Sequence, residues 1–356
     1  MREFFLKPVF QVRDDSYCWS DVALAAVVWG DWERLLREVR EGLACLHSYR
    51  DSGRPLPEEE IDAAAADFRY ERELISAQET EAWFARWGIS ASQWMGYIRR
   101  SVLRARLEPR LAELLARHPV SDSEVAAAAG VEAICSGLLT RLAPRLAARA
   151  AAYDQMRGAH QNGGPLYTDQ DVAGARREYP SDVRSLGLDV DDETLDACAT
   201  RLARAELALR DFRTAVITPR AVADQISSHH LEWIRVAYQT LIYPAEAMAR
   251  EALLCVREDG MDFTDLASAT AVADLREEEQ WIGEVTGPVH AGLLGARAGE
   301  VLGPYSIDGG HALLRLTDKR FPSSEDEQVR SRAETAALQR ALSNELQTRV
   351  HWLTTI

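Results

Sequence analysis

The pattern of apolar and polar residues is most regular between positions 233 and 319, where it predicts a compact α/β unit. Its first segment, Trp233–Tyr243, is rich in β-branched and aromatic residues, which favour a strand, and Pro244 ends it. The next segment, residues 245–256, places its apolar side chains on one face of a helix, and Gly260 stops that helix. A strand followed by an amphipathic helix is therefore expected at the start of this unit.

Further elements complete the predicted unit. Apolar residues favour two short helices, one near Phe263 and one at residues 289–294. The sequence Gly299–Pro304 is typical of a turn into a hairpin, whose closing strand is expected at Gly310–Leu316, before Thr317–Lys319 leaves the sheet. This order predicts a four-stranded antiparallel sheet with helices on one side and with the first and last strands adjacent at its centre.

Residues 16–228 carry the spacing and capping signals of short helices. Serine precedes several of the apolar runs, and Ser76 followed by Glu79 is typical of a capping box. The glycines and prolines between residues 155 and 192 predict a loop-rich connection within this helical region.

A last helix is predicted at residues 325–352, with an apolar stripe that is too long to leave in water. We therefore expect this helix to pack on residues 16–150. The whole sequence is thus predicted to be an α+β protein, with a helical domain at 1–228, an α/β domain at 229–321 and a returning carboxy-terminal segment at 322–356.

Composition narrows the classes of function. With 356 residues and 47% hydrophobic content, the chain is expected to form two or three domains. A formal net charge of −15 disfavours nucleic acid or an anionic membrane as a partner. The first residues lack the apolar core of a signal peptide, and no later apolar run approaches the roughly 20 residues of a membrane span, so we expect a cytoplasmic protein.

The residue types that bind metals and cofactors form no recognisable motif. The five cysteines are far apart and include no C-x-x-C pair, which argues against a disulfide framework and against a zinc site. The neighbouring His229 and His230 are candidate metal ligands or, more simply, residues at the C-terminus of a helix. Because there is no P-loop, G-x-G-x-x-G, G-x-S-x-G or H-E-x-x-H, we expect neither a metal nor another cofactor.

The order of strand, helices, Gly299–Pro304 turn, hairpin and basic exit resembles the parvulin (PpiC-like) family of peptidyl-prolyl isomerases. The helices before and after this unit resemble the layout of the SurA and PrsA foldases, which implies a chaperone-like helical domain that holds peptide. The resemblance also implies an apolar cup that holds an X-Pro bond above two histidines, one on the first strand and one on the last. Such a cup lowers a barrier of about 18–20 kcal/mol by twisting and desolvating the amide.

The sequence departs from that family at both histidine positions. Thr240 occupies the first. At the second, counting back from the end of the closing strand gives Ala312, whereas counting forward from its beginning gives His311. A shift of one residue turns a side chain to the other face of a sheet, and we favour Ala312 because Leu314 and Leu316 then share its face. The candidate catalytic residues are therefore Thr240 and, in the alternative register only, His311.

The middle of the unit also departs from the family. The glycine pair expected there is replaced by residues 276–283, in which Glu277–Glu279 is either a solvated face or a site that repels acidic peptides and attracts a basic leader. His290, at the start of a helix, is a further candidate for the cup. By resemblance, we expect the peptide-binding residues to be Trp281, Val289, Leu293, Leu294, Ala312 and Leu314.

Tryptophan is abundant, with nine residues in the chain. One interpretation is that the early tryptophans line an aromatic peptide groove, and the other is that they fill the core between short helices. These residues are Trp19, Trp29, Trp32, Trp83, Trp87 and Trp94.

Two functions fit these features. In the first, the chain is a parvulin- and SurA-like binding module that holds an unfolded or ribosomally made precursor peptide, for example for a peptide-modifying enzyme, while prolyl isomerisation is weak or lost. In the second, it is an active peptidyl-prolyl isomerase that acts on X-Pro bonds of a cytoplasmic client. The loss of both histidines in the favoured register supports the first.

Overall fold

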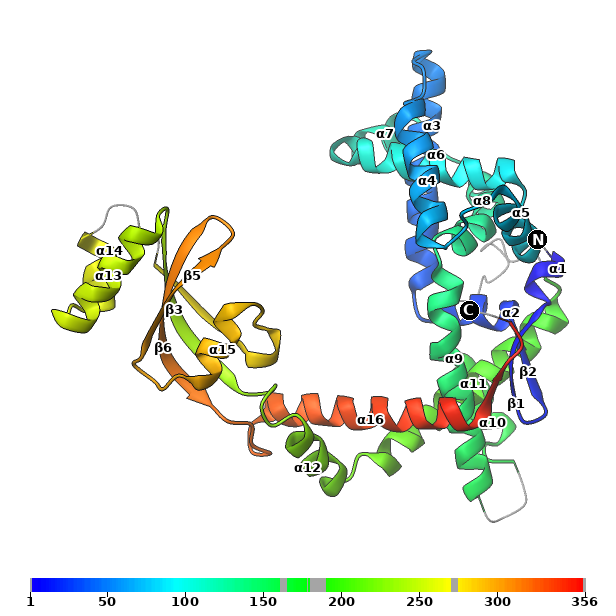
Figure 1. Cartoon of the computed structure of the whole chain (residues 1–356). Coiled ribbons are helices and arrows are strands. Elements are labelled where there is room, and N and C mark those ends of the chain that lie inside the picture. Colours follow the sequence, from blue (N-terminus) through cyan, green and yellow to red (C-terminus); the bar gives the residue numbers. More distant parts are fainter. Residues whose placement is uncertain (1, 161–164, 178, 180–189, 270–274, 355–356) are drawn as a thin grey trace. The chain divides into compact units, whose positions relative to one another are not determined.

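The computed structural model describes residues 2–160, 165–177, 179, 190–269 and 275–354, which form an α+β protein. The chain divides into two compact units (Figure 1). Unit 1 comprises Met1–Thr214 and Ala341–Ile356, and unit 2 comprises Ala215–Arg340. Each unit has its own hydrophobic core.

Unit 1 is mainly helical. Its elements are α1 (Arg2–Phe5), β1 (Pro8–Val12), β2 (Asp15–Cys18), α2 (Trp19–Val28), α3 (Asp31–Ser52), α4 (Glu58–Glu71), α5 (Ala77–Trp87), α6 (Ala91–Arg106), the 3-10 turn η1 (Glu108–Arg110), α7 (Leu111–Arg117), α8 (Asp122–Cys135), α9 (Leu138–Ala159), α10 (Asp169–Arg176), most of α11 (Asp192–Val216), the end of α16 (Glu327–Arg349) and β7 (Val350–Trp352).

Side-chain caps begin several of these helices, as the sequence predicts. Ser76 accepts a hydrogen bond from the backbone N–H of Glu79, and the Glu79 carboxylate accepts one from the backbone N–H of Ser76. The same reciprocal pair forms between Ser90 and Gln93 at the start of α6. These bonds satisfy N–H groups that the first turn of a helix leaves without partners.

The early tryptophans belong chiefly to the core of unit 1. Trp32 is fully buried, and Trp19, Trp87 and Trp94 are each less than a tenth exposed. Trp19 and Trp87 pack with Phe4, whose ring lies 5.6 Å from each of their rings. The structure therefore favours the core interpretation over an aromatic peptide groove in this region.

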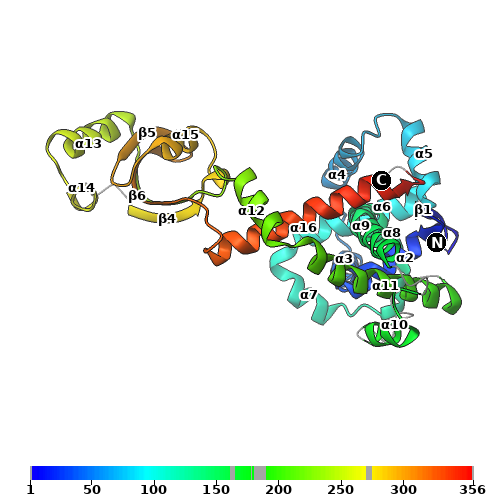
Figure 2. The same cartoon turned by 90° about the horizontal axis from the view of Figure 1, so that it is seen from below.

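A three-stranded antiparallel sheet in unit 1 is absent from the sequence-based prediction. Its order is β2-β1-β7, so the carboxy-terminal strand pairs with the first strand of the chain (Figure 2). The ring of Phe10 stacks on Tyr17 at 4.7 Å and meets Trp352 edge-on at 5.5 Å. Strands of three to five residues leave too short a local pattern to predict, and β7 in addition pairs with a strand that is remote in sequence.

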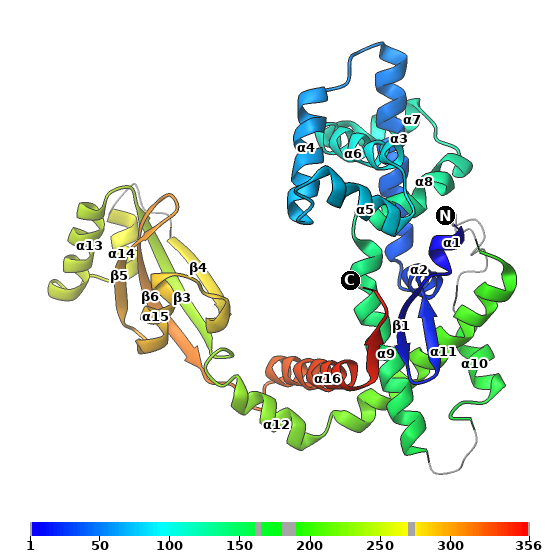
Figure 3. The ribbon, with the colours of Figure 1, turned by 45° about the vertical axis from the view of Figure 1, so that its right-hand side comes forward.

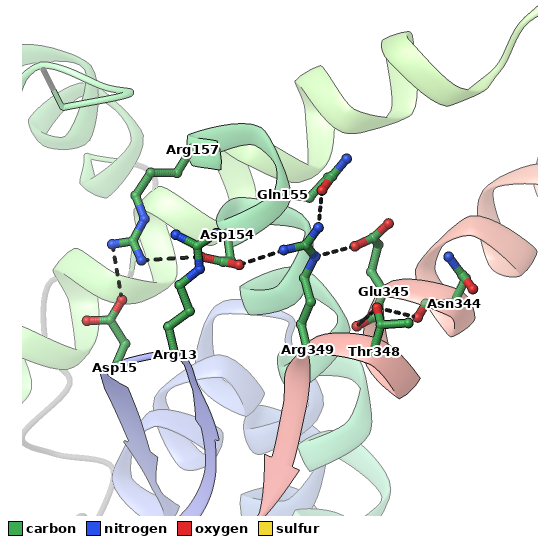
Figure 4. Close-up of polar contacts among 9 residues, drawn as sticks. All are labelled: Arg13, Asp15, Asp154, Gln155, Arg157, Asn344, Glu345, Thr348 and Arg349. Atoms are coloured by element: carbon green, nitrogen blue, oxygen red, sulfur yellow. Dashed lines mark hydrogen bonds and ion pairs between the residues drawn. The ribbon is translucent and has the colours of Figure 1, made fainter. Parts of the chain in front are cut away.

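A buried carboxylate helps to hold the returning end of the chain in unit 1. The Asp154 carboxylate, on α9, forms ion pairs with three guanidinium groups (Figure 4). The nitrogen–oxygen distances are 2.9 Å to Arg13, 3.2 Å to Arg157 and 2.9 Å to Arg349. The Asp154 side chain is only 2% exposed, so the three guanidinium groups compensate a charge that is otherwise costly to bury. Arg349 closes α16 just before β7 begins.

The observed borders of the units differ from those predicted. The sequence places the whole last helix on residues 16–150. In the structure α16 is divided: up to Arg340 it belongs to unit 2, where Val329 and Ala333 are buried beside Trp233, and from Ala341 it belongs to unit 1, where Leu346 packs against the core. The predicted loop-rich connection, residues 155–192, begins inside α9 and contains α10; its residues 161–164, 178 and 180–189 lie outside the described part of the chain.

Unit 2 contains a four-stranded sheet and seven helical segments, one of them a 3-10 turn, among its described residues. Its elements are the last residues of α11, then α12 (Pro219–Ser228), β3 (Arg235–Tyr243), α13 (Glu246–Glu258), α14 (Phe263–Ala269), β4 (Leu275–Trp281), the 3-10 turn η3 (Ile282–Glu284), α15 (Pro288–Gly295), β5 (Val301–Ile307), β6 (Gly310–Arg320) and the first part of α16.

The sheet has the order β4-β3-β6-β5 and is antiparallel throughout. The first and last strands are adjacent at its centre, as the sequence predicts. Helices cover both faces, however, and not one (Figure 3). Leu313 packs towards α13 and α14, whereas its neighbours Ala312 and Leu314 pack towards α15, because alternate residues of a strand point to opposite faces.

The last strand is longer than predicted. Instead of leaving the sheet at Thr317, β6 continues to Arg320, which pairs with Arg235. The pairing shifts between Ala237 and Tyr238, where Thr317 is the extra residue of a bulge in β6, and the Thr317 hydroxyl donates a hydrogen bond to the Ala237 carbonyl at 2.8 Å. The ammonium group of Lys319 then donates to three carbonyl oxygens at the end of α15, at 2.5–3.2 Å.

Candidate functional site

The sheet face that the resemblance assigns to catalysis carries Thr240 and Ala312. Thr240 pairs with Leu314 across the two central strands, and Ala312 lies two residues before Leu314 on the same face. His311 pairs with Tyr243 and points to the opposite face, where its Nδ1 lies 3.5 Å from the Ser306 hydroxyl. The register in the structure is therefore the one that places Ala312, and not His311, beside Thr240.

This face is closed by close packing. Leu293 of α15 is fully buried against it, and Ala312 and Leu314 are each 2% exposed. Tyr305 of β5 lies against Gly292, where a Cβ atom would stand 2.0 Å from the tyrosine hydroxyl oxygen. Three of the residues predicted to bind peptide are thus core residues in this structure, because apolar side chains from the sheet and from α15 bury one another.

The remaining polar groups on this face are few. The Tyr238 hydroxyl donates to the Glu278 carboxylate at 2.8 Å and accepts from the Gln280 amide. Burial and the nearby Glu278 raise the pKa of Tyr238 far above its ordinary value, so the phenol stays neutral. The Thr240 hydroxyl oxygen is buried and has no hydrogen-bond partner within the described ranges.

A groove of about 770 Å³ lies elsewhere in unit 2, between the junction of α12 with β3, the end of β4 and the first part of α16. It is lined by His229, Glu232, Trp233, Trp281, Glu327, Gln328, Ser331, Arg332, Thr335, Ala336 and Gln339. Of the six residues predicted to bind peptide, Trp281 is the one that lines this groove.

Aromatic side chains form one wall of the groove, and the Arg332 side chain of α16 lies against them. The His229 ring stacks on Trp233 at 4.5 Å with the ring planes 7° apart, and the Nδ1 of His229 lies 3.0 Å from the Gln225 carbonyl at the end of α12. The Arg332 guanidinium lies 5.9 Å from the Trp233 ring and 5.1 Å from the Trp281 ring. These distances are within the range of cation–π attraction.

Helix α16 supplies the opposite wall. Gln328, Ser331, Thr335 and Gln339 recur at helical spacing and face the groove, whereas Val329 lies on the neighbouring buried stripe. The sequence predicts this helix from its apolar stripe alone, and the polar stripe is not among the predicted site residues. The polar stripe can be recognised in the sequence by its amide and hydroxyl residues, which are spaced three or four positions apart beside the apolar stripe.

Smaller cavities also lie among the described residues of unit 1. One of about 560 Å³ lies between α10 and α11, and one of about 370 Å³ lies between Phe4, Lys7, Trp87 and the residues after β7. In the part of the chain that the structure describes, no group of three or more histidine, cysteine or acidic residues is placed to hold a metal ion. Within the same ranges, no single helix is long and apolar enough to span a membrane, although α8 and α9, which meet at 72°, pass that test as a pair.

No family model matches this sequence, and no curated protein matches it. Among solved structures, the chain is similar to the peptidylprolyl isomerase PrsA from Bacillus cereus, with 15% identity, 60% of this chain and 82% of that chain covered, and a TM-score of 0.35. PrsA from Bacillus anthracis has 15% identity, with 56% and 93% covered and a TM-score of 0.28. The foldase protein PrsA from Streptococcus pneumoniae has 16% identity, with 57% and 81% covered and a TM-score of 0.26.

Proposed function

We propose that this chain is a parvulin-like, peptide-holding protein in which prolyl isomerisation is weak or lost. The observation that carries the proposal is the contrast within unit 2 between a closed sheet face and an open groove beside Trp233 and Trp281. At about 770 Å³, the groove is within the size range of about 300–1,000 Å³ that is typical of ligand sites.

The lining of the groove suits a polypeptide. Indole rings such as that of Trp281 offer a large apolar surface that tolerates many side chains. The amides of Gln328 and Gln339 and the hydroxyls of Ser331 and Thr335 both donate and accept hydrogen bonds, as a peptide backbone requires. A site that binds the backbone and offers general apolar contact holds a chain without strong dependence on its sequence.

The closed face argues against efficient isomerisation. Catalysis by the mechanism that the resemblance implies requires the X-Pro bond to enter an apolar cup and lose its water. Here Leu293 and Tyr305 fill that space, and Thr240 and Ala312 offer no group that titrates near neutral pH. A barrier of about 18–20 kcal/mol is not lowered by a cup that the bond does not reach.

The client in this proposal is an unfolded or ribosomally made precursor peptide in the cytoplasm, held for a peptide-modifying enzyme. A net charge of −15 supports a peptide over nucleic acid or an anionic membrane as the partner. The assignment to the cytoplasm rests on the sequence alone. The most specific part of the proposal is that the peptide is held for a modifying enzyme.

Binding of an unstructured, fluorescein-labelled peptide of about 20 residues tests the proposal by fluorescence anisotropy. Trp281→Ala should weaken binding about 30-fold, or about 2 kcal/mol, as expected for an aromatic residue at the centre of a binding site. Tyr70→Ala is the matched control, because Tyr70 is 69% exposed and lies in unit 1, and it should leave the Kd unchanged. No binding by the wild-type chain, or equal Kd values for wild type and Trp281→Ala, would refute the proposal.

Catalysis is measured separately on a short proline tetrapeptide. We expect little acceleration by the wild-type chain, and we expect Thr240→Ala to leave the rate unchanged. A parvulin-like acceleration that disappears in His311→Ala would instead favour the active isomerase, because it would place that histidine in the catalytic site.

A further inference from the structure

We propose that the groove of unit 2 selects cationic peptides, and that Arg332 is an internal occupant which an arginine or lysine side chain of the peptide displaces. This inference rests on the proposed function and adds the chemical class of the peptide. Its starting point is the surroundings of Trp281, which already contain two guanidinium groups of the chain itself.

The first observation is that the Trp281 indole contacts two arginine side chains, each of which is also paired with a carboxylate. The Arg235 guanidinium lies 5.3 Å from the Trp281 ring and 3.2 Å from the Glu279 carboxylate. The Arg332 guanidinium lies 5.1 Å from the same ring and 2.9 Å from the Glu284 carboxylate. In both cases an aromatic face and a carboxylate hold the cation together, so the groove contains a site with the chemistry that a guanidinium requires.

The second observation is that the two arginines are held to different degrees. Arg235 is 18% exposed, and besides Glu279 it contacts Asp326 at 3.5 Å and the Gln328 side chain at 2.5 Å. Arg332 is 38% exposed and has Glu284 as its ion-pair partner. An exposed ion pair on a flexible side chain contributes little to stability, so Arg332 is the cation that a ligand displaces at low cost.

The third observation is the charge at the rim. Glu232 and Glu327 both line the groove, both are exposed, and neither forms an ion pair in the described part of the chain. Displacement of Arg332 also frees the Glu284 carboxylate. A cationic peptide therefore gains up to three carboxylate partners and the indole face, whereas an acidic peptide meets these carboxylates as like charges.

The experiment uses the full-length chain and three labelled peptides of one unstructured sequence, in which three positions are arginine, citrulline or glutamate. Citrulline keeps the shape of arginine without its charge. We expect the arginine peptide to bind at least about tenfold more tightly than the citrulline peptide, with the glutamate peptide weakest. Added salt should reduce the difference, because the rim charges are exposed.

Two sets of variants test the internal occupant. Arg332→Gln should tighten binding of the arginine peptide severalfold, because it removes the competitor, whereas Arg340→Gln on the same helix, an exposed position outside the groove lining, should have no effect. Glu232→Gln together with Glu327→Gln should weaken the arginine peptide and leave the citrulline peptide unchanged. This dependence on peptide charge separates a direct contact from a general loss of folding.

The outcomes distinguish the two proposals. If the glutamate peptide binds most tightly and Arg332→Gln abolishes its binding, Arg332 is an anchor for acidic peptides and this inference is wrong, although the proposed function stands. Equal affinities for the three peptides would also show that this inference is wrong, because the groove would not select peptides by charge, and the proposed function would stand. If no peptide binds, the proposed function fails and this inference fails with it.

Discussion

Two regions of unit 2 contain apolar surface, but they differ in what covers that surface. The sheet face around Thr240 and Ala312 is covered by α15 and by Tyr305 of the same chain. The groove beside Trp281 is open, and its second wall is the polar stripe of α16. The difference indicates that the order of strands and helices alone does not show whether a sheet face is accessible to a ligand. Here its accessibility depends on a few packing residues, Leu293 and Tyr305 among them.

The largest effect is expected at the closed face. Because Leu314 lies on the central strand β6, is 2% exposed and belongs to the core that the sheet shares with α15, Leu314→Ala should reduce the free energy of unfolding of unit 2 by about 3 kcal/mol. If Leu314 instead formed the wall of an open cup, the same change would weaken peptide binding and leave stability nearly unchanged. Urea denaturation followed by tryptophan fluorescence distinguishes these results.

The contact between Gly292 and Tyr305 gives the next largest effect. A Cβ atom at position 292 would stand 2.0 Å from the tyrosine hydroxyl oxygen, so Gly292→Ala should destabilise unit 2 by about 1–3 kcal/mol. Tyr305→Phe removes that oxygen and should recover part of the loss. Equal effects of Gly292→Ala in the wild-type and Tyr305→Phe backgrounds would show that Tyr305 does not close the face.

A smaller effect of opposite sign is expected at Thr240. Its hydroxyl oxygen is buried and has no partner in the described part of the chain, so a hydroxyl is being desolvated without compensation. Thr240→Val keeps the shape and should stabilise unit 2 by about 0.5–1 kcal/mol. A loss of stability in thermal unfolding would indicate that the hydroxyl has a partner.

The smallest expected effect is a dependence of stability on pH. It concerns Asp262, which pairs with Arg315 on the sheet face opposite to Thr240. Hydrogen bonds from the Thr264 side chain and backbone, with a further contribution from Arg315, lower the pKa of Asp262 from 3.8 to about 2. A lowered pKa stabilises the folded state above about pH 4, and this contribution is lost as the pH falls towards 2. The stability difference between wild type and Asp262→Asn should therefore shrink over that window, and a constant difference would contradict the assignment.

Local patterns and the resemblance together predict the sheet of unit 2, because its strands and helices are each long enough to show their own periodicity. They also predict the register in which Ala312, and not His311, shares a face of the sheet with Thr240. The groove is not predictable in this way, since Trp233, Trp281 and Arg332 lie on three elements that are far apart in sequence. The closure by Tyr305 is missed for the same reason, because it depends on one side chain that meets one glycine of another element.

The central claim is that peptide binds in the groove and not on the sheet face. An NMR titration of the full chain with the arginine peptide tests this claim most directly. It follows the indole N–H of Trp281 together with the backbone amides of Thr240 and Ala312. The account predicts a saturable shift of the Trp281 signal while both amides stay in place. Shifts of the Thr240 and Ala312 amides with an unchanged Trp281 signal would contradict it.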